Sequence, residues 1–266
     1  MQRDILQRIV LLIVLATSSL IEASEPILHR LNSTRQASET TVRVLLPDLV
    51  PKHDEPGLPV VYVLPVEAGD GTRWGNSLAE IQKHDLHNKH RVVCVFPTLS
   101  DLPWYADHPE NPQLQQEAYL LQDVLPLVEK NYPVSKNRLL VGFSKSGWGA
   151  WSLLLRHPDL FHRAAAFDAP MMMDAPGKYG SGPIFGTVEN FRKYRISSLL
   201  RERAVELKKD PSRLILIGQG NFHAEHEAIK LQLESAMIPF TFIADPVREH
   251  TWHSDWLPEA FEWLTI

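Results

Sequence analysis

Cysteine is almost absent from this sequence, because Cys94 is the only one among 266 residues. A chain with one cysteine cannot form an internal disulfide, so the class of small secreted domains held together by disulfides is excluded. The apolar neighbours of Cys94 in the segment VVCVF favour a buried strand position over a reactive thiol. Runs of basic residues are also absent and the net charge is −5, so the sequence carries no electrostatic footprint for nucleic acid.

Long hydrophobic runs are missing as well. The apolar run Ile9 to Ala16 near the N-terminus is shorter than the roughly 20 residues that a membrane span requires. Arg3 and Arg8 precede this run and small residues follow it, which is the layout of a signal peptide. We therefore expect residues 1–24 to be a signal peptide and the mature chain to be secreted or periplasmic, without stable membrane insertion after removal of the signal. A retained membrane anchor is the alternative.

The remaining chain has the size of one α/β domain, and its hydrophobic fraction of 44% is sufficient for a sizeable core. Residues 25–37 are polar and aperiodic and are expected to form a linker or arm, followed by a single domain over 38–266. Several strand candidates are apolar throughout, which is typical of parallel strands covered on both faces. The candidates are 41–46, 60–64, 92–96, 138–141, 164–167, 214–217 and 240–243.

Amphipathic helical segments alternate with these strands. They are expected near 78–84, 114–130, 148–156, 188–208, 225–236 and 257–264. This alternation predicts an α/β fold with a mostly parallel, doubly wound sheet and helices on both faces. The segment 170–186 is rich in Gly, Pro and Met and is too long for an ordinary connection, so it could form a lid. Its methionines, Met171 to Met173, could cover a cleft or fill a gap in the core.

A motif typical of a catalytic serine lies in LLVGFSKSGWGAWSLLL, residues 139–155. A buried strand runs into GFSKSG and then into a helix, which is the context of a nucleophile elbow centred on Ser144. Small residues two places before and after this serine let strand and helix approach closely, and Ser146 keeps the small size at the second position. The turn also directs the Lys145 N–H at the place where an oxyanion develops in acyl transfer. An ordinary turn with a helix-capping serine is the alternative.

A serine hydroxyl becomes a good nucleophile when a base takes its proton, so a histidine is expected after the last strand. His250 and His253 both follow the final strand candidate, and the histidine comes last in chain order in hydrolases that have this elbow. His250 is preferred, because His253 would lie nearly one turn into the segment that leads to the terminal helix.

These motifs resemble the esterase family that includes esterase D (S-formylglutathione hydrolase), feruloyl esterase domains and the mycobacterial antigen 85 mycolyltransferases. The resemblance runs from about Val42 to the C-terminus and rests on LPVVYVLPVEAG, PWYADHP, VGFSKSGWGA and EHTWHSDW. It implies an α/β-hydrolase fold and a small-molecule ester substrate. His250-Thr251-Trp252 matches the family's Gly-His followed by a tryptophan, and the resemblance therefore also supports His250 as the base.

Two positions depart from the family pattern. Pro65-Val66 stands where the family usually has a His-Gly pair after its oxyanion-loop strand. Because backbone N–H groups are the donors in such a loop, Val66 or Glu67 is expected to complete an oxyanion hole with Lys145. On the loop after LILIG, where the family's aspartate would fall, this sequence has Asn221.

The acid that orients the histidine must therefore come from another position, and Asp168 is the first choice. It ends the strand AAAFD just after the elbow helix, and a carboxylate from that strand can reach the same histidine in some hydrolases of this fold. Its role would be to hold the imidazole in the right tautomer and to stabilise the imidazolium. Glu225 is the second choice and Asp174 the third. A solvated or helix-capping carboxylate is the alternative for Asp168.

Two other groups invite a functional interpretation. Trp104 and Tyr105 match the family's substrate-side loop and are expected to bind substrate through aromatic surface, or else to pack the loop on the domain. The segment His223-Ala224-Glu225-His226 could suggest a metal site, but it lacks the HExxH spacing, and we expect no metal.

The sequence thus predicts a serine carboxylic-ester hydrolase that acts through an acyl-enzyme on Ser144 and needs no cofactor. Acyl transfer of the antigen 85 type and a non-catalytic binding protein of the same fold are the alternatives. The acyl group, the alcohol and the oligomeric state stay open, because specificity depends on loop shape.

Overall fold

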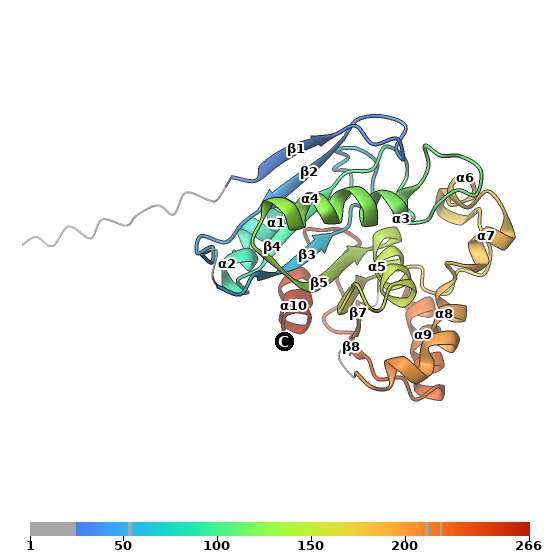
Figure 1. Ribbon diagram of the computed structural model, residues 1–266. Coiled ribbons are helices and arrows are strands. Elements are labelled where there is room, and N and C mark those ends of the chain that lie inside the picture. Colours follow the sequence, from blue (N-terminus) through green and yellow to red (C-terminus); the bar gives the residue numbers. More distant parts are fainter. Residues whose placement is uncertain (1–24, 53–54, 211–212, 219) are drawn as a thin grey trace, which may run out of the picture.

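A single sheet organises the part of the chain that the structure describes. The structure is a computed structural model and describes residues 25–52, 55–210, 213–218 and 220–266. Eight strands in these residues pair in the order β1-β2-β4-β3-β5-β6-β7-β8 (Figure 1). They are β1 (Ile27–Leu31), β2 (Thr40–Leu45), β3 (Leu58–Val63), β4 (Val93–Pro97), β5 (Val134–Phe143), β6 (Arg163–Phe167), β7 (Leu214–Ile217) and β8 (Thr241–Ile243). β2 is antiparallel to both neighbours, and the pairings from β4 to β8 are parallel. The predicted mostly parallel sheet is confirmed.

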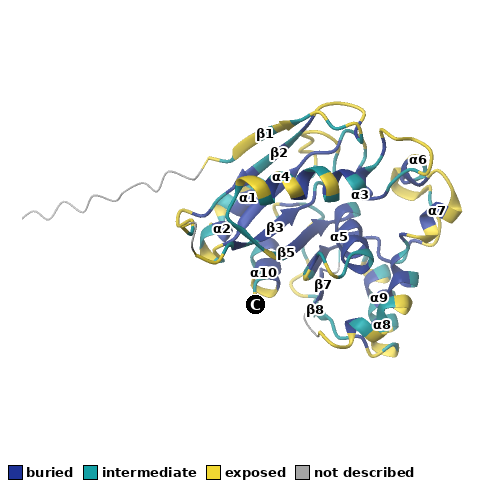
Figure 2. Ribbon diagram, in the orientation of Figure 1, coloured by how far each residue is buried: buried dark blue, intermediate teal, exposed yellow. Residues whose placement is uncertain are grey.

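The segment expected to be a linker or arm is where the structure differs most from the sequence prediction. Residues 27–31 form β1, which pairs antiparallel with β2 from Ile27↔Val44 to Leu31↔Thr40. The backbone carbonyl of Arg35 also accepts a hydrogen bond from the Gln115 N–H at 3.1 Å. β1 is an edge strand and buries little of either face (Figure 2). Its sequence, ILHRL, therefore shows no hydrophobic pattern from which a strand could be predicted.

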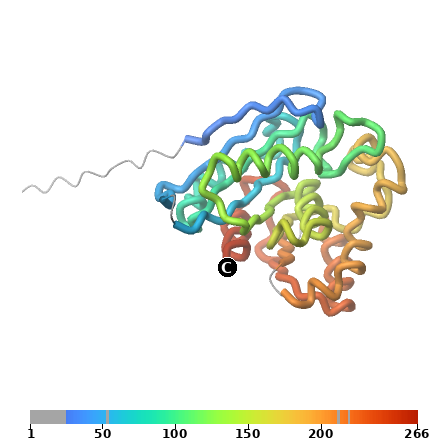
Figure 3. The backbone as a smooth tube through the Cα atoms, viewed as in Figure 1, coloured from blue at the N-terminus to red at the C-terminus, as the bar shows by residue number. Residues whose placement is uncertain are grey.

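Ten α-helices of the described residues cover the sheet. They are α1 (Ser77–Lys83), α2 (Leu86–Lys89), α3 (Gln116–Tyr119), α4 (Leu125–Asn131), α5 (Lys145–Arg156), α6 (Gly182–Phe185), α7 (Val188–Arg192), α8 (Ile196–Leu207), α9 (His223–Ser235) and α10 (Leu257–Leu264). A π-helical turn, Leu120–Val124, joins α3 to α4, and a 3-10 turn lies at Lys178–Gly180. The tube in Figure 3 follows this path from blue β1 through green α4 to red α10.

Two hydrophobic layers lie on opposite faces of the sheet. Along β3 the side chains alternate, with Val60 and Tyr62 in one cluster and Val61 and Val63 in the other. The first cluster packs against α4, α5, α8 and α9, and the second against α1, α2 and α10. Cys94 is buried in the second cluster, as its apolar neighbours predict. The central strands are therefore covered on both faces, as their continuous apolar runs indicate.

The direction of winding reverses between β3 and β5. The chain leaves β3 toward β4 on one side, and it leaves β5 toward β6 on the other. In open α/β sheets the crevice at such a switch point, beyond the carboxyl ends of the strands, is the usual place for a ligand. The candidate serine follows β5, and the candidate oxyanion loop follows β3.

The expected signal peptide, residues 1–24, lies outside the described residues. Among the residues that the structure does describe, no helix combines the length and the apolar character needed to cross a bilayer.

Candidate active site

Ser144 occupies a strained turn between β5 and α5. Its backbone has φ 54° and ψ −126°, a region that residues other than glycine rarely adopt and that costs about 1–3 kcal/mol. Hydrogen bonds hold the turn on both sides: the Ser144 N–H donates to the Phe167 carbonyl at 2.9 Å, and the Trp148 N–H donates to the Ser144 carbonyl at 3.1 Å. The predicted elbow geometry is present, with the hydroxyl at the carboxyl edge of the sheet.

The small residues around the serine are required by close contacts. A Cβ on Gly142 would lie 2.3 Å from the Ser146 carbonyl oxygen, and a Cβ on Gly147 would lie 2.9 Å from the Ala169 Cβ. Ser146 also ties the turn together, because its Oγ accepts from the Phe143 N–H and donates to the Phe143 carbonyl, both at 2.9 Å. The serine at the last small position of the motif therefore contributes hydrogen bonds as well as small size.

His250 lies beside the elbow. Its ring packs against Phe143, the residue before Ser144, with ring centroids 4.6 Å apart, and against Trp74 at 5.3 Å. Its Nδ1 is 2.6 Å from Asp168 Oδ2. Because a carboxylate accepts the Nδ1 proton, the Nε2 lone pair stays available as a base. The structure thus brings three of the predicted residues, Ser144, His250 and Asp168, to one edge of the sheet.

Asp168 directly follows β6 and is fully buried. Besides His250 it accepts hydrogen bonds from two backbone amides, Asn221 N–H to Oδ2 at 2.9 Å and Phe222 N–H to Oδ1 at 2.8 Å. Burial alone would raise the pKa of this carboxyl, but the hydrogen bonds from His250, Phe222 and Asn221 outweigh it and hold the pKa below its ordinary value. The side chain is therefore a carboxylate at neutral pH.

The loop after β7 is shaped around this carboxylate. A Cβ on Gly220 would lie 2.5 Å from Asp168 Oδ2, so glycine lets the backbone approach the charge. Asn221, at the position where the resemblance implies an aspartate, contributes its backbone N–H and not an acidic side chain. The carboxylate that contacts His250 comes instead from the residue after β6, and the β7 loop encloses it.

His226 is a supporting residue that the sequence did not reveal. It is fully buried on α9, where Nε2 accepts from the Ala169 N–H and Nδ1 donates to the Gly218 carbonyl, both at 2.9 Å. Both ring nitrogens are occupied, so His226 cannot be the metal ligand that HAEH could suggest. Burial lowers its pKa and keeps it neutral. It links the ends of β6 and β7 on either side of Asp168, and nothing in the local sequence predicts such long-range contacts.

Of the three expected oxyanion-hole residues, Val66 and Glu67 lie on the loop after β3, and Lys145 is the first residue of the helix after β5. The Leu64 N–H donates to the Val141 carbonyl at 2.9 Å, which prolongs the β3–β5 ladder to the point where Pro65-Val66 begins. Glu67 accepts from the Trp74 N–H at 3.3 Å. Lys145 opens α5, and its N–H lies in the first turn, where helix N–H groups lack intrahelical partners. Burial lowers the pKa of the Lys145 amine, and the charge of Glu67 opposes this shift.

The expected substrate-binding role of Trp104 and Tyr105 needs correction. Their exposed fractions are 0% and 1%, so neither offers aromatic surface to a substrate. Trp104 packs against Trp148 and Phe185, and the Tyr105 hydroxyl donates to the Pro65 carbonyl at 2.6 Å. Loop packing, the alternative for this pair, is what the structure has.

The other candidate residues lie apart from the Asp168–His250 pair. Glu225 accepts from the Met172 N–H at 2.8 Å and so holds the segment 170–186, in which Met171 and Met173 are buried in the core. Asp174 is exposed. His253 accepts from the Asn76 N–H at 2.9 Å at the end of the loop after β3.

One cluster in the described part of the chain has the spacing of metal ligands, namely Glu80, His84 and Asp255. The Lys83 ammonium already contacts Glu80 at 2.8 Å and Asp255 at 3.3 Å. The cluster is therefore an ion-pair network between α1 and the segment before α10.

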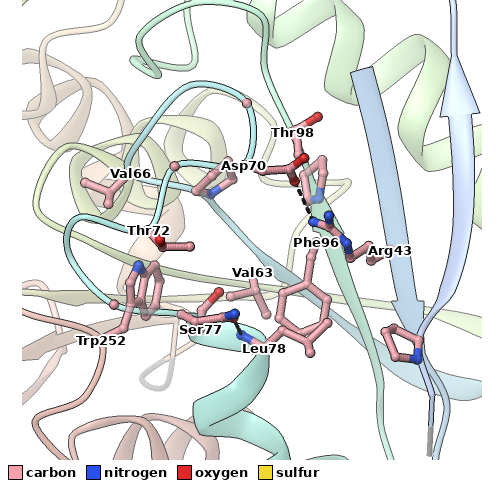
Figure 4. A pocket seen from close by; sticks show the side chains of 17 residues that line it. Arg43, Val63, Val66, Asp70, Thr72, Ser77, Leu78, Phe96, Thr98 and Trp252 are labelled. Atoms are coloured by element: carbon pink, nitrogen blue, oxygen red, sulfur yellow. Dashed lines mark hydrogen bonds and ion pairs between the residues drawn. The ribbon is translucent and has the colours of Figure 1, made fainter. Parts of the chain in front are cut away.

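A cavity of about 300 Å³ lies over the carboxyl ends of β3 and β4 (Figure 4). Val63 and Phe96 line it from these strands, and the loop after β3 contributes Val66 and Thr72. An ion pair between Arg43 and Asp70, 2.8 Å apart, also belongs to its wall. Neither Ser144 nor His250 lines this cavity. The loop after β3 therefore borders the cavity, whereas the candidate serine and histidine lie outside it.

Comparisons with known proteins agree with this fold. The model of a family described as "Putative esterase" matches residues 33–228, more than half of the chain. An S-formylglutathione hydrolase from Staphylococcus aureus is 18% identical over 91% of this chain and 98% of its own, with a TM-score of 0.71. A ferulic acid esterase is 20% identical over 91% and 96%, with a TM-score of 0.69. MPT51 from Mycobacterium tuberculosis is 16% identical over 91% and 97%, with a TM-score of 0.67.

Proposed function

The chain belongs to the esterase family and has an α/β-hydrolase fold, and on this premise we propose that it is a serine carboxylic-ester hydrolase that acts through an acyl-enzyme on Ser144. The observation that carries the proposal is the buried Asp168–His250 hydrogen bond of 2.6 Å, with the imidazole packed against the residue that precedes the strained serine. Such a base held next to such a serine serves to activate a hydroxyl.

In the acylation step, His250 Nε2 takes the Ser144 Oγ proton while Oγ attacks the ester carbonyl carbon. The carbonyl oxygen gains negative charge, and backbone N–H groups of Lys145 and of the Val66–Glu67 loop stabilise it. Asp168 stabilises the imidazolium that forms. The tetrahedral species then collapses, the alcohol departs with the proton from Nε2, and the acyl group stays on Oγ as an ester.

In the deacylation step, water enters where the alcohol left and gives a proton to His250 Nε2 as it attacks the acyl carbon. The same N–H groups stabilise the second oxyanion. Collapse returns the proton to Ser144 Oγ and releases the carboxylic acid. Every proton is carried by the imidazole, so the residues present are sufficient for the chemistry of a small-molecule ester.

Ser144→Ala tests the proposal. We expect kcat/KM for p-nitrophenyl esters to fall by about 10⁴-fold or more, because the nucleophile is removed. A fluorophosphonate probe should add to one serine of the wild type, with the adduct mapped to Ser144 by peptide mass spectrometry, and should not add to the variant.

Ser152→Ala is the matched control, because Ser152 is also a buried serine of α5 and its Oγ donates to the Tyr194 carbonyl at 3.2 Å. It should keep the wild-type rate and the adduct. Unchanged hydrolysis by Ser144→Ala would reject the mechanism. A wild type that neither hydrolyses esters nor reacts with the probe would instead support a binding protein of this fold.

Acyl transfer to an alcohol shares the acylation step and differs only in the acceptor. Product analysis in the presence of added alcohols distinguishes the two reactions, because a transferase forms the new ester in preference to the free acid. We propose water as the acceptor, and a product mixture dominated by the new ester would reassign the chain to transfer.

Export is part of the proposal and rests on the basic residues and the apolar run within residues 1–24. N-terminal sequencing of the protein recovered outside the cytoplasm should find a chain that begins near Ala23. A full-length chain retained in the membrane fraction would favour the anchor.

A further inference from the structure

The Tyr105 hydroxyl contacts the loop that carries the proposed oxyanion donors. The side chain is 1% exposed and donates to the Pro65 carbonyl oxygen at 2.6 Å. Its partner is one residue before Val66, on the loop that leaves β3 beside the serine elbow. Burial raises the pKa of this phenol far above its ordinary value, so the hydroxyl remains a donor across the working pH range.

The planarity of the peptide bond makes this contact directional. In a trans peptide the carbonyl of Pro65 and the N–H of Val66 lie in one plane and point in opposite directions. A hydrogen bond that fixes the carbonyl therefore also fixes the direction of the Val66 N–H, away from Tyr105. The hydrogen bond from the Leu64 N–H to the Val141 carbonyl is the last one of the β3–β5 ladder. Pro65 follows it and has no N–H, so it cannot hold the loop through a backbone donor.

Several features hold Tyr105 in place. Its backbone has φ 53°, in the left-handed region, and its N–H donates to Gln116 Oε1 at 2.9 Å. Gln116 is fully buried and also accepts from the Trp104 N–H at 2.8 Å. On the other side the phenol ring lies against α5, where a Cβ on Gly149 would be 2.1 Å from Tyr105 Cδ2. The position of the Tyr105 hydroxyl is thus fixed by three features. These are its own strained backbone, the buried Gln116 amide and the close contact with Gly149 of α5.

We propose that Tyr105 is a positioning residue of the oxyanion hole, and that its hydroxyl fixes the Pro65–Val66 peptide plane so that the Val66 N–H faces the developing oxyanion. The inference rests on the proposed function and adds to it a role for a residue that does not touch the substrate. Because the interaction matters most when charge develops on the carbonyl oxygen, its loss should affect the transition state more than substrate binding.

Tyr105→Phe keeps the ring and removes the hydroxyl. We expect kcat for p-nitrophenyl esters to fall about 10-fold to 100-fold, somewhat less than the loss of a complete oxyanion donor, while KM changes less than about twofold. Inhibition by a trifluoromethyl ketone, whose adduct with Ser144 places an oxyanion in the hole, should weaken by a similar factor.

The matched control is Tyr119→Phe. Tyr119 is also fully buried, and its hydroxyl lies 2.8 Å from Thr40 Oγ1, away from the elbow. This control loses a comparable buried hydrogen bond and should lower the melting temperature to a similar extent, with unchanged kcat and unchanged ketone inhibition. A merely structural role of Tyr105 predicts the same behaviour for both variants.

Gly149→Ala provides a second variant, because the added methyl group must displace the Tyr105 ring. It should lower kcat in the same way even where Tyr105→Phe does not fold. If Ser144→Ala is inactive but either folded variant keeps the wild-type kcat, the inference about Tyr105 is overturned. If Ser144→Ala is active, the proposed function itself fails, and the two failures are distinguishable.

Discussion

The two halves of the carboxyl edge of the sheet differ in how they hold their polar groups. Beyond β5 and β6, Ser144 and Asp168 are almost wholly buried, and His250 is fixed between the carboxylate and aromatic rings. Beyond β3 and β4, the Arg43–Asp70 pair lies at an open cavity, with 35% and 63% of the two side chains exposed. The cavity next to the loop after β3 is therefore not where the reactive groups converge. In this protein, buried and hydrogen-bonded polar side chains indicate the proposed catalytic site better than the presence of a cavity does.

The largest effect expected from this difference concerns the buried acid. Asp168→Asn should lower kcat by about 10³-fold to 10⁴-fold, because the amide cannot stabilise the imidazolium and favours the wrong tautomer. The control is Glu225→Gln, which alters a half-buried carboxylate that caps the Met172 N–H and should retain activity within a few-fold. Kinetics with p-nitrophenyl esters measures both. The opposite ranking would make Glu225 the acid.

The elbow glycine should dominate stability. Gly142→Ala places a methyl group 2.3 Å from the Ser146 carbonyl oxygen, and we expect the free energy of unfolding to drop by at least about 2 kcal/mol. In Gly182→Ala the new Cβ has its nearest neighbour at 3.8 Å, so the change should stay within about 1 kcal/mol. Urea unfolding compares the two variants. Equal stabilities would show that the strand and helix can separate at the turn without cost.

A pH series sharpens the comparison for Asp168. Its pKa is held below the ordinary value of 3.8, so the carboxylate stabilises the fold above that pH and the contribution is lost as the pH falls through the lower folded value. The difference in urea midpoint between wild type and Asp168→Asn should therefore narrow below about pH 4, as the carboxylate takes up its proton. A difference that keeps growing below about pH 4 would contradict a depressed pKa.

The smallest effect is expected on the cavity side. Arg43→Ala removes an exposed ion pair and should change the free energy of unfolding by less than about 1 kcal/mol. Because neither Ser144 nor His250 lines the cavity, kcat for short p-nitrophenyl esters should stay within about twofold. A loss of activity comparable to that of Asp168→Asn would show that the cavity takes part in the reaction.

The sequence predicted most of the sheet because buried parallel strands are continuous apolar runs. All seven expected strands are present, and Leu214–Ile217 is the clearest example, since LILI is buried throughout. β1 was missed because an exposed edge strand needs no hydrophobic pattern. The helical pattern over 188–208 predicts one helix, whereas the structure ends α7 at Arg192 and begins α8 at Ile196.

The candidate site was predictable where the chain order determines it. The elbow around Ser144 is a motif of consecutive residues. Asp168 and His250 each follow a predicted strand, so the order of the strands was sufficient to identify them as candidates. The roles of Tyr105 and His226 depend on hydrogen bonds to Pro65, Ala169 and Gly218, which lie far away in the sequence. An aromatic residue in a loop does not indicate whether it faces solvent or the core, and for Tyr105 this made the expectation wrong.

The enclosure of Asp168 by the loop after β7 has a consequence for behaviour in salt. Dissolved ions screen a charge only where they can approach it, and the backbone at Gly220 occupies the space next to this carboxylate. The field that Asp168 exerts on His250 is thus carried through protein alone. The turnover of such an enzyme should therefore stay nearly constant from low to high ionic strength, even where the ion pairs on its surface are screened.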